Sequence, residues 1–520
     1  MTETEKPVFV HLLPPCNHAC AAGEDIQSWM QLAGAGDYHG AWKSLVRNNP
    51  LPAVMGRVCY HPCESDCNRT HFDQPVNIHA VERFLGDQAI RHGWQLETSA
   101  PPTGKRVLVI GAGPGGLSAA YHLRRLGHSV AIWEAAPQAG GMMRFGIPRY
   151  RLPRNILDAE IARIAALGVD IKLNAKVDDL AAVRKQEPFD AVFLAVGAHL
   201  ARRAYIPAQD AGRILDALSV LRNVEGGVTP KLGRRVLVYG GGNTALDAAR
   251  TVKRLGASEA LIIYRRTREK MPAQDFEVQE ALEEGVQFKW LSTIHAAGEN
   301  SFTIEKMSLD ETGFPRPTGE YETIAGENVI LALGQDVDLG FLKRMEGLVV
   351  ENGVVKVDEH MMTGCPGVFA GGDMAPGDRT VTSAVGHGKK AARNIDAYLR
   401  GLEHRAPAGA DVATFARLNM RHYAHASRTA ERAALTPEQR LSSFDEVIAG
   451  LDETNALFES RRCLSCGNCH ECDNCYKVCP GDAIEKLGAG NGYRFVYDNC
   501  DGCGLCAEEC PCGAIDMQVN

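Results

Sequence analysis

The spacing of the cysteines constrains this chain more than any other feature of its sequence. Sixteen of the seventeen cysteines lie in two groups, five from Cys16 to Cys67 and eleven from Cys463 to Cys512. The other, Cys365, stands alone in a predicted turn and is expected to be inert. The sequence starts without a recognisable secretory signal and contains no long apolar run, so we expect a cytoplasmic location and no membrane insertion. Disulfides are rare in that reducing compartment, and the two groups therefore indicate metal or cluster ligands.

The second group contains two runs with one spacing, C-x2-C-x2-C-x3-C-P. Their cysteines are Cys469, Cys472, Cys475 and Cys479, then Cys500, Cys503, Cys506 and Cys510. This is the spacing of bacterial ferredoxins with two [4Fe–4S] clusters, in which the fourth cysteine of each run ligates the other cluster. Cys510 is therefore predicted to join the first run and Cys479 the second. Structural zinc is the alternative, but eight matching positions and both prolines favour iron–sulfur clusters. Cys512 is expected to be spare.

A glycine-rich turn in the middle of the chain predicts a dinucleotide site. The stretch from Lys105 to Glu134 reads as a buried strand, a turn, a helix and a second strand. The glycines of the turn are Gly111, Gly113, Gly115 and Gly116. Glycines let the backbone approach a pyrophosphate at the helix N-terminus. Glu134 ends the second strand, where a carboxylate accepts hydrogen bonds from ribose hydroxyls.

A second strand, turn and helix of this kind runs from Arg234 to Ala273. Its G-x-G-x-x-A turn and helix start contain Gly240, Gly242, Asn243, Thr244 and Ala245. No acid ends the next strand, and Arg265 and Arg266 stand there instead. A basic pair suits a 2′-phosphate, which favours NADPH over NADH and leaves NAD open. The alternative is that both arginines are solvated surface charges.

Two further motifs indicate which dinucleotide the first turn binds. The segment TGCPGVFAGGDMAPGD, with Gly372 and Asp373, resembles the carboxy-terminal flavin motif of flavoprotein reductases that have two dinucleotide domains. The AVG that ends at Gly197 resembles the middle motif of the same superfamily. The resemblance implies FAD in the first site and an NAD(P) domain nested between two FAD segments. Hydride transfer between stacked rings needs little acid–base apparatus, so no catalytic side chain is predicted.

Four stretches in combination, GRVCYHPCESDC, GAGPGG, RFGIPRYRLP and YRRTREKMPA, resemble the small (β) subunit of glutamate synthase and its relatives, which include dihydropyrimidine dehydrogenase. The resemblance covers roughly the first 400 residues. In that family an N-terminal helical domain holds two [4Fe–4S] clusters. The resemblance implies that the cysteines of the first group are ligands: Cys16, Cys20, Cys59, Cys63 and Cys67.

This sequence departs from the family pattern in one pair of ligands. The family's first C-x2-C pair is absent near residue 1, and we expect Cys463 and Cys466 to supply it by folding back. One ligand is then still missing from two clusters, and relatives use a Gln or Glu there, which points to Glu82. The alternatives are that Cys463 and Cys466 are free thiols and that Glu82 is an exposed charge on a helix. The expected cofactors are FAD, NAD(P)H and four [4Fe–4S] clusters.

These motifs predict a multidomain α/β chain with nested Rossmann-like domains. The expected parts are a helical [4Fe–4S] domain (1–102), an FAD domain in two pieces (103–225 and 339–405), an NAD(P) domain (226–338), a helical connector (406–462) and the cysteine pair with an α+β ferredoxin-like domain (463–520). In the connector, one helical face is expected to carry Phe444, Val447, Ile448 and Leu451.

The predicted function is electron transfer between NAD(P)(H) and a partner iron–sulfur enzyme or ferredoxin through FAD and the clusters. The ferredoxin region favours the NAD(P)-linked subunit of a 2-oxoacid oxidoreductase complex from anaerobic metabolism. A small subunit of glutamate synthase is the alternative, and a non-catalytic cluster-bearing scaffold is a third. A net charge of −8 argues against nucleic acid and anionic membranes as partners.

Overall fold

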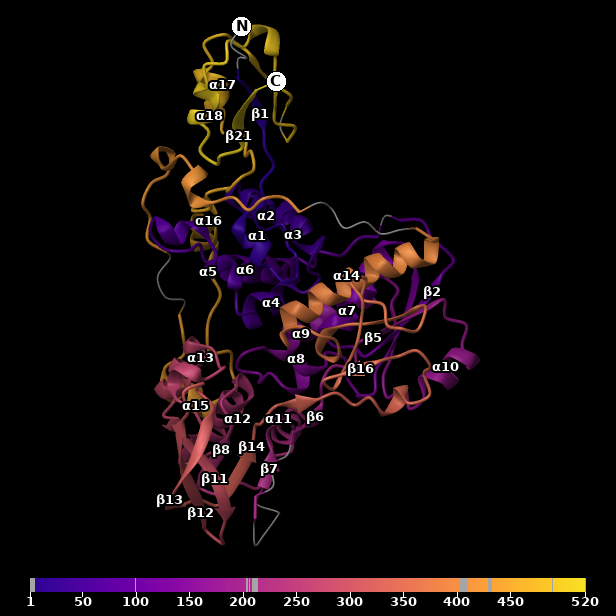
Figure 1. Cartoon of the computed structure of the whole chain (residues 1–520), viewed down its shortest axis with the longest axis vertical. Helices are drawn as coiled ribbons and strands as arrows, with labels where there is room; N and C mark the ends of the chain where they lie inside the picture. The colour runs from indigo at the N-terminus through magenta and orange to yellow at the C-terminus, as the bar shows by residue number, and fades with distance from the viewer. Residues whose placement is uncertain are drawn as a thin grey trace. The chain divides into compact units, whose positions relative to one another are not determined.

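The computed structural model describes residues 5–98, 100–202, 204, 206–207, 214–402, 409–428, 433–488 and 490–519. The chain forms two compact units (Figure 1). The first unit comprises Met1–Leu96, Glu403–Arg432 and Gly450–Asn520, and the second comprises Glu97–Leu402 and Ala433–Ala449. Each unit is therefore assembled from stretches that lie far apart in the sequence.

Short helices from the start of the chain form the first part of unit 1. They are α1 (Pro15–Ala19), α2 (Ile26–Gly34), α3 (Tyr38–Val46), α4 (Pro52–Val58), α5 (Pro62–Ser65), the 3₁₀ turn η1 (Asn68–His71) and α6 (Ile78–Arg91). Helix α16 (Glu453–Arg461) packs against α2 and α6. Helices α4 and α6 cross closely, because a Cβ on Gly56 would lie 2.4 Å from the backbone nitrogen of Arg83. This crossing packs α4, which Cys59 follows directly, against α6.

The tail of the chain forms the second part of unit 1. It contains α17 (Asn474–Val478), α18 (Leu505–Glu508) and an antiparallel hairpin of β19 (Ile484–Lys486) and β20 (Tyr493–Phe495). Strand β1 (Glu5–Phe9) pairs antiparallel with β21 (Ile515–Val519), and both labels lie together in Figure 1. The ring of Phe9 stacks on that of Phe495, with centroids 4.6 Å apart. The start of the chain thus completes the ferredoxin-like part.

The predicted helical connector is wrong for most of its length. Residues 409–428 run extended and contain two single 3₁₀ turns, η6 (Phe415–Arg417) and η7 (Met420–His422). Helix α15 (Pro437–Ser442) is short, and residues 443–452 form no helix. The predicted helical face of Phe444, Val447, Ile448 and Leu451 is absent because backbone groups of this stretch form hydrogen bonds with residues far away in the sequence instead of within a helix. The Val447 N–H donates to the Tyr150 carbonyl at 3.0 Å.

Unit 2 begins with a parallel sheet that forms the first lobe. Its strand order is β18 (Val368–Ala370), β5 (Ala191–Leu194), β2 (Arg106–Ile110), β3 (Ser129–Trp133) and β4 (Asp170–Lys172). Helices α7 (Pro114–Arg125) and α14 (Val381–Arg400) pack side by side, as Figure 1 shows. Their backbones nearly touch, because a Cβ on Gly388 would lie 2.3 Å from the Gly115 carbonyl oxygen. The lobe also contains α8 (Met142–Phe145), α9 (Arg154–Ala165) and α10 (Leu180–Gln186).

A second parallel sheet forms the other lobe of unit 2. Its strand order is β10 (Gln287–Lys289), β9 (Glu259–Ile263), β8 (Arg235–Tyr239), β14 (Asn328–Leu331) and β7 (Ile214–Asp216). Its helices are α11 (Ala217–Glu225), α12 (Asn243–Arg254) and α13 (Asp275–Glu283). An antiparallel meander of β11 (Ser292–Ala297), β12 (Ser301–Leu309) and β13 (Pro315–Ala325) is inserted. The nesting of this lobe between β5 and β18 confirms the predicted fold class.

Buried charges join the two lobes of unit 2. The ring of Tyr150 is fully buried, with the Arg254 guanidinium 3.8 Å and the Arg250 guanidinium 4.8 Å from its centroid. Both arginines donate to the carboxylate of Glu284 at 2.6 to 2.9 Å. Because Tyr150 lies between α8 and α9 of the first lobe and Glu284 follows α13 of the second, this network fixes one lobe against the other.

Candidate flavin, nucleotide and iron–sulfur sites

The first glycine-rich turn joins β2 to α7. Gly111 has a φ of +105°, and its Cβ would lie 2.4 Å from the Ala195 carbonyl oxygen. A Cβ on Gly116 would lie 1.9 Å from the Gly111 carbonyl oxygen, so neither position accepts a side chain. At Gly113 the nearest atom to a Cβ is 3.9 Å away and belongs to Gly141. Open space before the free N–H groups of a helix is the cradle that a pyrophosphate requires.

Glu134 is fixed beside this turn. Its Oε2 accepts a hydrogen bond from the Ala112 N–H at 2.7 Å, and its Oε1 accepts one from the Ala136 N–H at 2.8 Å. Each carboxylate oxygen has two acceptor sites, so a second site on each is available for a ribose hydroxyl. Gly115 lies in the first turn of α7, where a Cβ would be 3.2 Å from the Ala384 carbonyl oxygen of α14.

The other two predicted flavin segments lie at the same edge of this sheet. Strands β2, β5 and β18 are parallel neighbours, and they lead directly into Gly111, Gly197 and Gly372. Gly197 and Gly372 have φ of +68° and +66°, conformations that favour glycine. Burial raises the pKa of Asp373, and the Arg379 charge acts in the opposite direction. The three segments therefore meet where ligands bind in open parallel sheets, and the residues present fit FAD.

The second glycine-rich turn has the same construction. A Cβ on Gly240 would lie 2.3 Å from the Ala332 carbonyl oxygen, whereas one on Gly242 would meet no atom within 4 Å. Helix α12 begins at Asn243 and continues through Thr244 and the fully buried Ala245. The Asn243 side-chain oxygen accepts from the Gln274 N–H at 3.1 Å, which ties the turn to the segment before α13.

The two predicted phosphate-binding arginines follow β9. Tyr264 packs over the turn, since a Cβ on Gly241 would lie 2.3 Å from its ring. Arg265 is exposed and Arg266 is half-buried. The buried Nε of Arg266 has no hydrogen-bond partner within the described part of the chain. A guanidinium donor beside a nucleotide turn fits a 2′-phosphate.

Four thiols from distant parts of the sequence line one cavity in unit 1, which we call the inner cavity. They are the thiols of Cys16, Cys67, Cys463 and Cys466. Burial raises the pKa of all four, to about 11 for Cys463 and about 12 for Cys466. Thiols that are buried together ionise only when a positive charge compensates them, and iron supplies that charge. The donor set and its enclosure fit a [4Fe–4S] cluster.

Three further thiols lie in the same helical part. Burial raises the pKa of Cys20, and the charges of Glu24, Glu82 and Cys59 add to this effect. Burial also raises the pKa of Cys63, on which Cys59 and Cys20 act as well. We call Cys20, Cys59, Cys63 and Glu82 the carboxylate group.

Glu82 is not the exposed helix charge that the sequence left open as an alternative. Its residue is 6% exposed, and its Oε1 accepts a hydrogen bond from the Asn49 side chain at 2.8 Å. The same amide donates to Glu24 Oε1 at 2.9 Å. Glu24 is thus a second buried carboxylate near Cys20, which the sequence analysis missed because a single glutamate in a loop carries no pattern.

The tail holds two groups of thiols. The outer tail group lines a cavity and contains Cys479, Cys500, Cys503 and Cys506. The inner tail group contains Cys469, Cys472, Cys475 and Cys510, whose charges act on one another. In each group one thiol comes from the other C-x2-C-x2-C-x3-C run. The Sγ of the buried Cys512 lies 3.7 Å from that of Cys510, and Cys365 is buried in unit 2.

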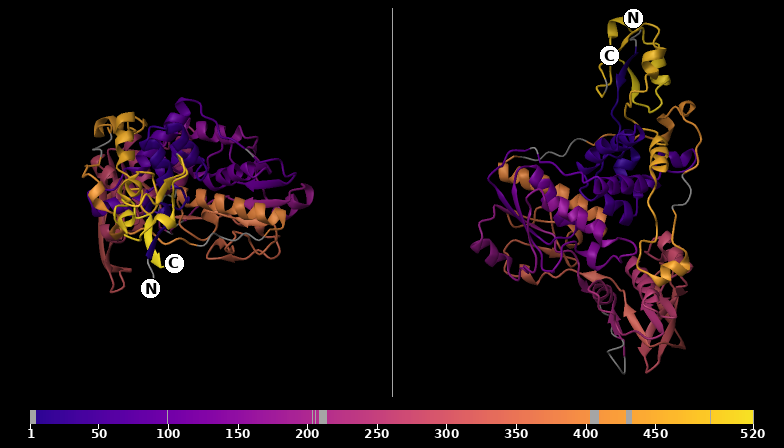
Figure 2. Two further views of the ribbon diagram at one scale, coloured as in Figure 1. Left: turned by 90° about the horizontal axis from the view of Figure 1, so that it is seen from above. Right: turned by 180° about the vertical axis from the view of Figure 1, so that it is seen from behind.

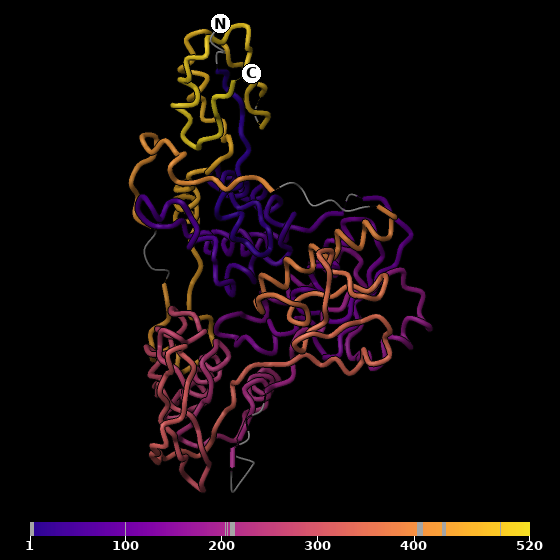
Figure 3. The backbone as a smooth tube through the Cα atoms, viewed as in Figure 1, coloured from indigo at the N-terminus to yellow at the C-terminus, as the bar shows by residue number. Residues whose placement is uncertain are grey.

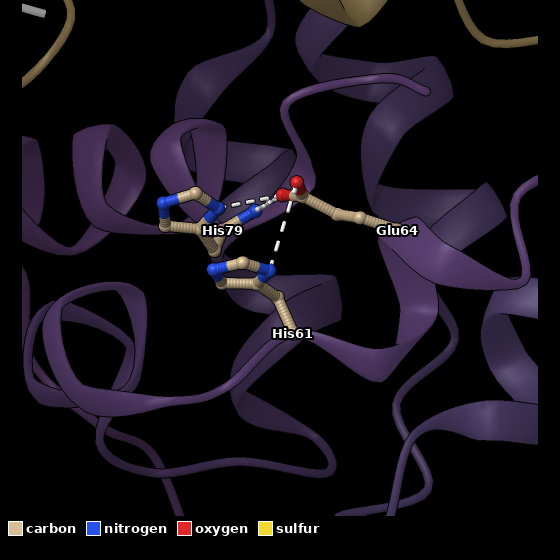
Figure 4. A group of neighbouring side chains, drawn as sticks. All are labelled: His61, Glu64 and His79. Atoms are coloured by element: carbon tan, nitrogen blue, oxygen red, sulfur yellow. Dashed lines mark hydrogen bonds and ion pairs between the residues drawn. The ribbon is translucent and has the colours of Figure 1, made fainter. Parts of the chain in front are cut away.

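One cluster of side chains in unit 1 resembles a metal site, and Figure 4 shows it. Glu64 contacts the Nδ1 atoms of His79, at 2.6 Å, and His61, at 3.8 Å. The two imidazole rings stack with centroids 4.1 Å apart and planes within 17°, so their lone pairs do not converge on one point. Arg428 donates to Glu64 Oε2 at 2.7 Å. The group is better explained as ion pairs that hold the 409–428 segment against α5 and α6.

Family profiles match three regions of the chain. The pyridine nucleotide-disulphide oxidoreductase profile matches residues 105–388. The profile of dihydropyrimidine dehydrogenase domain II, a 4Fe-4S cluster domain, matches residues 11–94. The 4Fe-4S dicluster profile matches residues 468–514.

Named relatives cover most of the chain. The β subunit of NADP(+)-dependent formate dehydrogenase from Moorella thermoacetica is 38% identical, over 87% of this chain and 70% of the relative. The β subunit of NADPH-Fe(3+) oxidoreductase from Geobacter sulfurreducens is 32% identical, over 90% and 78%. The PreT subunit of NAD-dependent dihydropyrimidine dehydrogenase from Escherichia coli is 34% identical, over 74% and 91%.

Among the described residues, no helix combines the length and apolar character needed to cross a bilayer. Both dinucleotide turns, the first cysteine group and the cysteines from Cys469 to Cys512 lie within the matched profiles, whereas Cys463 and Cys466 lie just before the last of these matches. The chain therefore belongs to the pyridine nucleotide-disulphide oxidoreductases, in the branch of NAD(P)H-dependent FAD and iron–sulfur oxidoreductases.

Proposed function

We propose that this chain is the NAD(P)H-linked electron-transfer subunit of a larger oxidoreductase and that it carries one FAD and four [4Fe–4S] clusters. The inner cavity, the carboxylate group, the inner tail group and the outer tail group each hold one cluster. The observation that carries the proposal is the inner cavity, because its thiols come from both cysteine-rich regions. Without Cys463 and Cys466 this cavity has only the thiols of Cys16 and Cys67.

When bound, FAD exchanges a hydride with the nicotinamide and the clusters accept single electrons. The chain supplies binding and orientation for this chemistry. The turn at Gly111–Gly116 and Glu134 hold the flavin nucleotide, and Gly197 and Asp373 lie at the same sheet edge. The turn at Gly240–Ala245 and the pair Arg265 and Arg266 hold NADPH, with NADH as the weaker ligand.

The partner is inferred to be a separate subunit that carries the substrate site. The sequence analysis favours a 2-oxoacid oxidoreductase, whereas the names of two relatives point to formate dehydrogenase and to Fe(3+) reduction. Anaerobic co-purification of the tagged chain, followed by identification of the retained subunits, separates these classes. A glutamate synthase large subunit among them would support the alternative function.

Iron and flavin analysis tests the proposed cofactors. The anaerobically purified chain is expected to contain about 16 irons and about one FAD, and to reduce a viologen dye with NADPH. The Cys463→Ser/Cys466→Ser double variant is expected to lose about four of these irons. Cys365→Ser is the matched control, since that buried cysteine lies in unit 2 and should leave the iron content unchanged.

Three results would contradict parts of the proposal. An iron content near eight in the unmodified chain would show that the helical part of unit 1 holds no clusters. An unchanged iron content in the double variant would remove the inner cavity as a site. The absence of flavin bleaching on addition of either nucleotide would leave only the scaffold function.

A further inference from the structure

The extended segment 409–428, which can be followed in Figure 3, connects the two parts of unit 1. On one side it contacts the helical part, where Asn68 donates to the Ala413 carbonyl at 2.9 Å and Arg69 to the Ala424 carbonyl at 3.0 Å. Its other side contacts the tail. The Asn419 N–H donates to the Pro511 carbonyl at 3.1 Å. The segment therefore fastens the tail onto the helices.

Tyr423 occupies the point of this segment that faces both cysteine-rich parts. Its hydroxyl donates to the Leu464 carbonyl at 2.7 Å, within the turn that carries Cys463 and Cys466. Burial raises the pKa of Tyr423, and so do the charges of Cys512, Cys466, Cys463 and Cys510. The phenol therefore holds the turn that carries two thiols of the inner cavity, and Asn419 of the same segment contacts the residue after Cys510 of the inner tail group.

The two sites around Tyr423 are also joined by very short stretches of chain. Cys466 of the inner cavity and Cys469 of the inner tail group are separated by two residues, and three extended residues span at most about 11 Å. The Gly467 N–H donates to the Cys512 carbonyl at 2.7 Å. Gly467 has a φ of +77°, and a Cβ there would lie 2.6 Å from the Cβ of Leu12. The junction is therefore tightly packed.

We propose that Tyr423 is a positioning residue shared by two iron–sulfur sites, the inner cavity and the inner tail group. Its hydroxyl holds the 463–467 turn through the Leu464 carbonyl, and that turn is joined to the 510–512 turn by the hydrogen bond from Gly467 to Cys512. The inference rests on the ligand assignment of the proposed function. Its consequence is that these two clusters behave as one coupled pair whose separation and polarity depend on a single side chain.

The test uses the Tyr423→Phe variant of the full chain, purified anaerobically. The substitution keeps the ring and removes only the hydroxyl. Tyr497→Phe is the matched control, since Tyr497 donates to the Pro7 carbonyl at 3.1 Å beside the outer tail group. Total iron, electron paramagnetic resonance of the reduced protein and a potentiometric titration are measured on the unmodified chain and both variants.

At full iron content, Tyr423→Phe is expected to shift the midpoint potentials of the inner pair and to weaken the magnetic interaction between its two reduced clusters. Tyr497→Phe is expected to leave both properties of that pair unchanged. Selective loss of iron from the inner pair in Tyr423→Phe, with the outer cluster retained, also supports the shared role. Unchanged potentials and interaction at full iron, or equal loss of iron from every site, overturns it.

Failure of the underlying ligand assignment gives a different result. In that case the Cys463→Ser/Cys466→Ser double variant retains all the iron of the unmodified chain. The inner cavity is then not a cluster site, whatever Tyr423→Phe does. If the double variant loses iron and Tyr423→Phe has no effect, only the role of Tyr423 is wrong.

Discussion

Glu5 lies directly opposite Val519 in the antiparallel pair of β1 and β21. Figure 2 shows the indigo strand beside the yellow tail from two further directions. The same strand reaches the outer tail group, because Pro7 lines its cavity and Lys6 Nζ donates to the Cys500 carbonyl. Residues near the start of the sequence are therefore part of a cysteine site near its end.

Removing the ring of Phe9 is expected to loosen this end of unit 1. Phe9 is half-buried and stacks on Phe495, so Phe9→Ala should lower the free energy of unfolding of the tail by about 2 kcal/mol. Limited proteolysis of the anaerobic protein is expected to cleave the tail faster. Phe314→Ala is the control, because Phe314 is exposed in unit 2. Equal proteolysis of both variants would contradict a structural role for β1.

Alanine substitutions at two glycines of the flavin turn are expected to have different effects, one on stability and one on flavin binding. Gly116→Ala would place its Cβ 1.9 Å from the Gly111 carbonyl oxygen and should destabilise the lobe itself. Gly113→Ala meets no atom nearer than 3.9 Å, so the apoprotein should keep its melting temperature while its new methyl group blocks the pyrophosphate. Thermal unfolding of the flavin-free protein and the flavin content after reconstitution measure the two effects. Normal flavin binding by Gly113→Ala would place FAD elsewhere.

The arginine pair after β9 is expected to set the nucleotide preference. Charged hydrogen bonds contribute about 1.5–3 kcal/mol, so Arg265→Ala/Arg266→Ala should raise the KM for NADPH roughly 10- to 100-fold. The KM for NADH, which lacks the 2′-phosphate, should change little. Arg268→Ala is the control, since Arg268 is exposed beyond the pair. Equal losses with both nucleotides would show that the pair does not read the phosphate.

Acid should weaken the network that joins the two lobes of unit 2. Burial alone would raise the pKa of Glu284, but hydrogen bonds from Arg254 and Arg250 outweigh it and lower this pKa to about 2. An unfolded glutamate titrates near pH 4.5, so the stabilisation by Glu284 is complete above that pH and is lost as the pH falls from about 4.5 towards 2. Denaturant unfolding across this range measures it.

The Glu284→Gln variant should lack this pH dependence. Because it leaves the buried Arg254 without the charge of Glu284 and leaves Arg250 only that of Glu280, it should also lose about 3–5 kcal/mol of stability near neutral pH. The adjacent Glu283→Gln changes a half-exposed ion pair with Arg440 and should cost less than about 1 kcal/mol. Similar losses of stability in both variants would contradict a greater contribution from the buried Glu284 than from the half-exposed Glu283.

A comparison of two buried glutamates tests the carboxylate group. Glu82→Ala is expected to release about four irons, because it removes the ligand proposed to complete the site. Glu24→Ala is expected to retain them, although its charge acts more strongly on Cys20. Iron analysis and the visible absorption of the anaerobic proteins distinguish the variants. The opposite pattern would assign the ligand to Glu24.

The sequence predicted features that depend on local pattern. A strand, a glycine turn and a helix follow one another within about 30 residues, and the fold confirms both such units. The spacing of the cysteines also identified which regions would hold iron–sulfur domains. Which individual side chains are ligands stays a prediction, even though the inner cavity brings Cys16, Cys67, Cys463 and Cys466 together.

The features that the sequence missed depend on distant contacts. The stretch EKPVF carries no sign that its partner strand lies near residue 519, because pairing across such a separation leaves no local signal. The helical pattern at Phe444–Leu451 was overridden when Val447 and Ile448 used their backbones to contact Tyr150 and Ala434. Tyr423 belongs to no motif, and only the fold brings it near thiols from two regions.

The inner cavity has a consequence for how the protein is made. Cys463 and Cys466 are translated about 400 residues after Cys16 and Cys67. Unit 2 can fold in the interval, since it comprises Glu97–Leu402 and Ala433–Ala449. On the proposed ligand assignment, Cys16 and Cys67 lack two of their fellow ligands until then, so insertion of iron and sulfide into the inner cavity is expected to be a late step in the maturation of the protein.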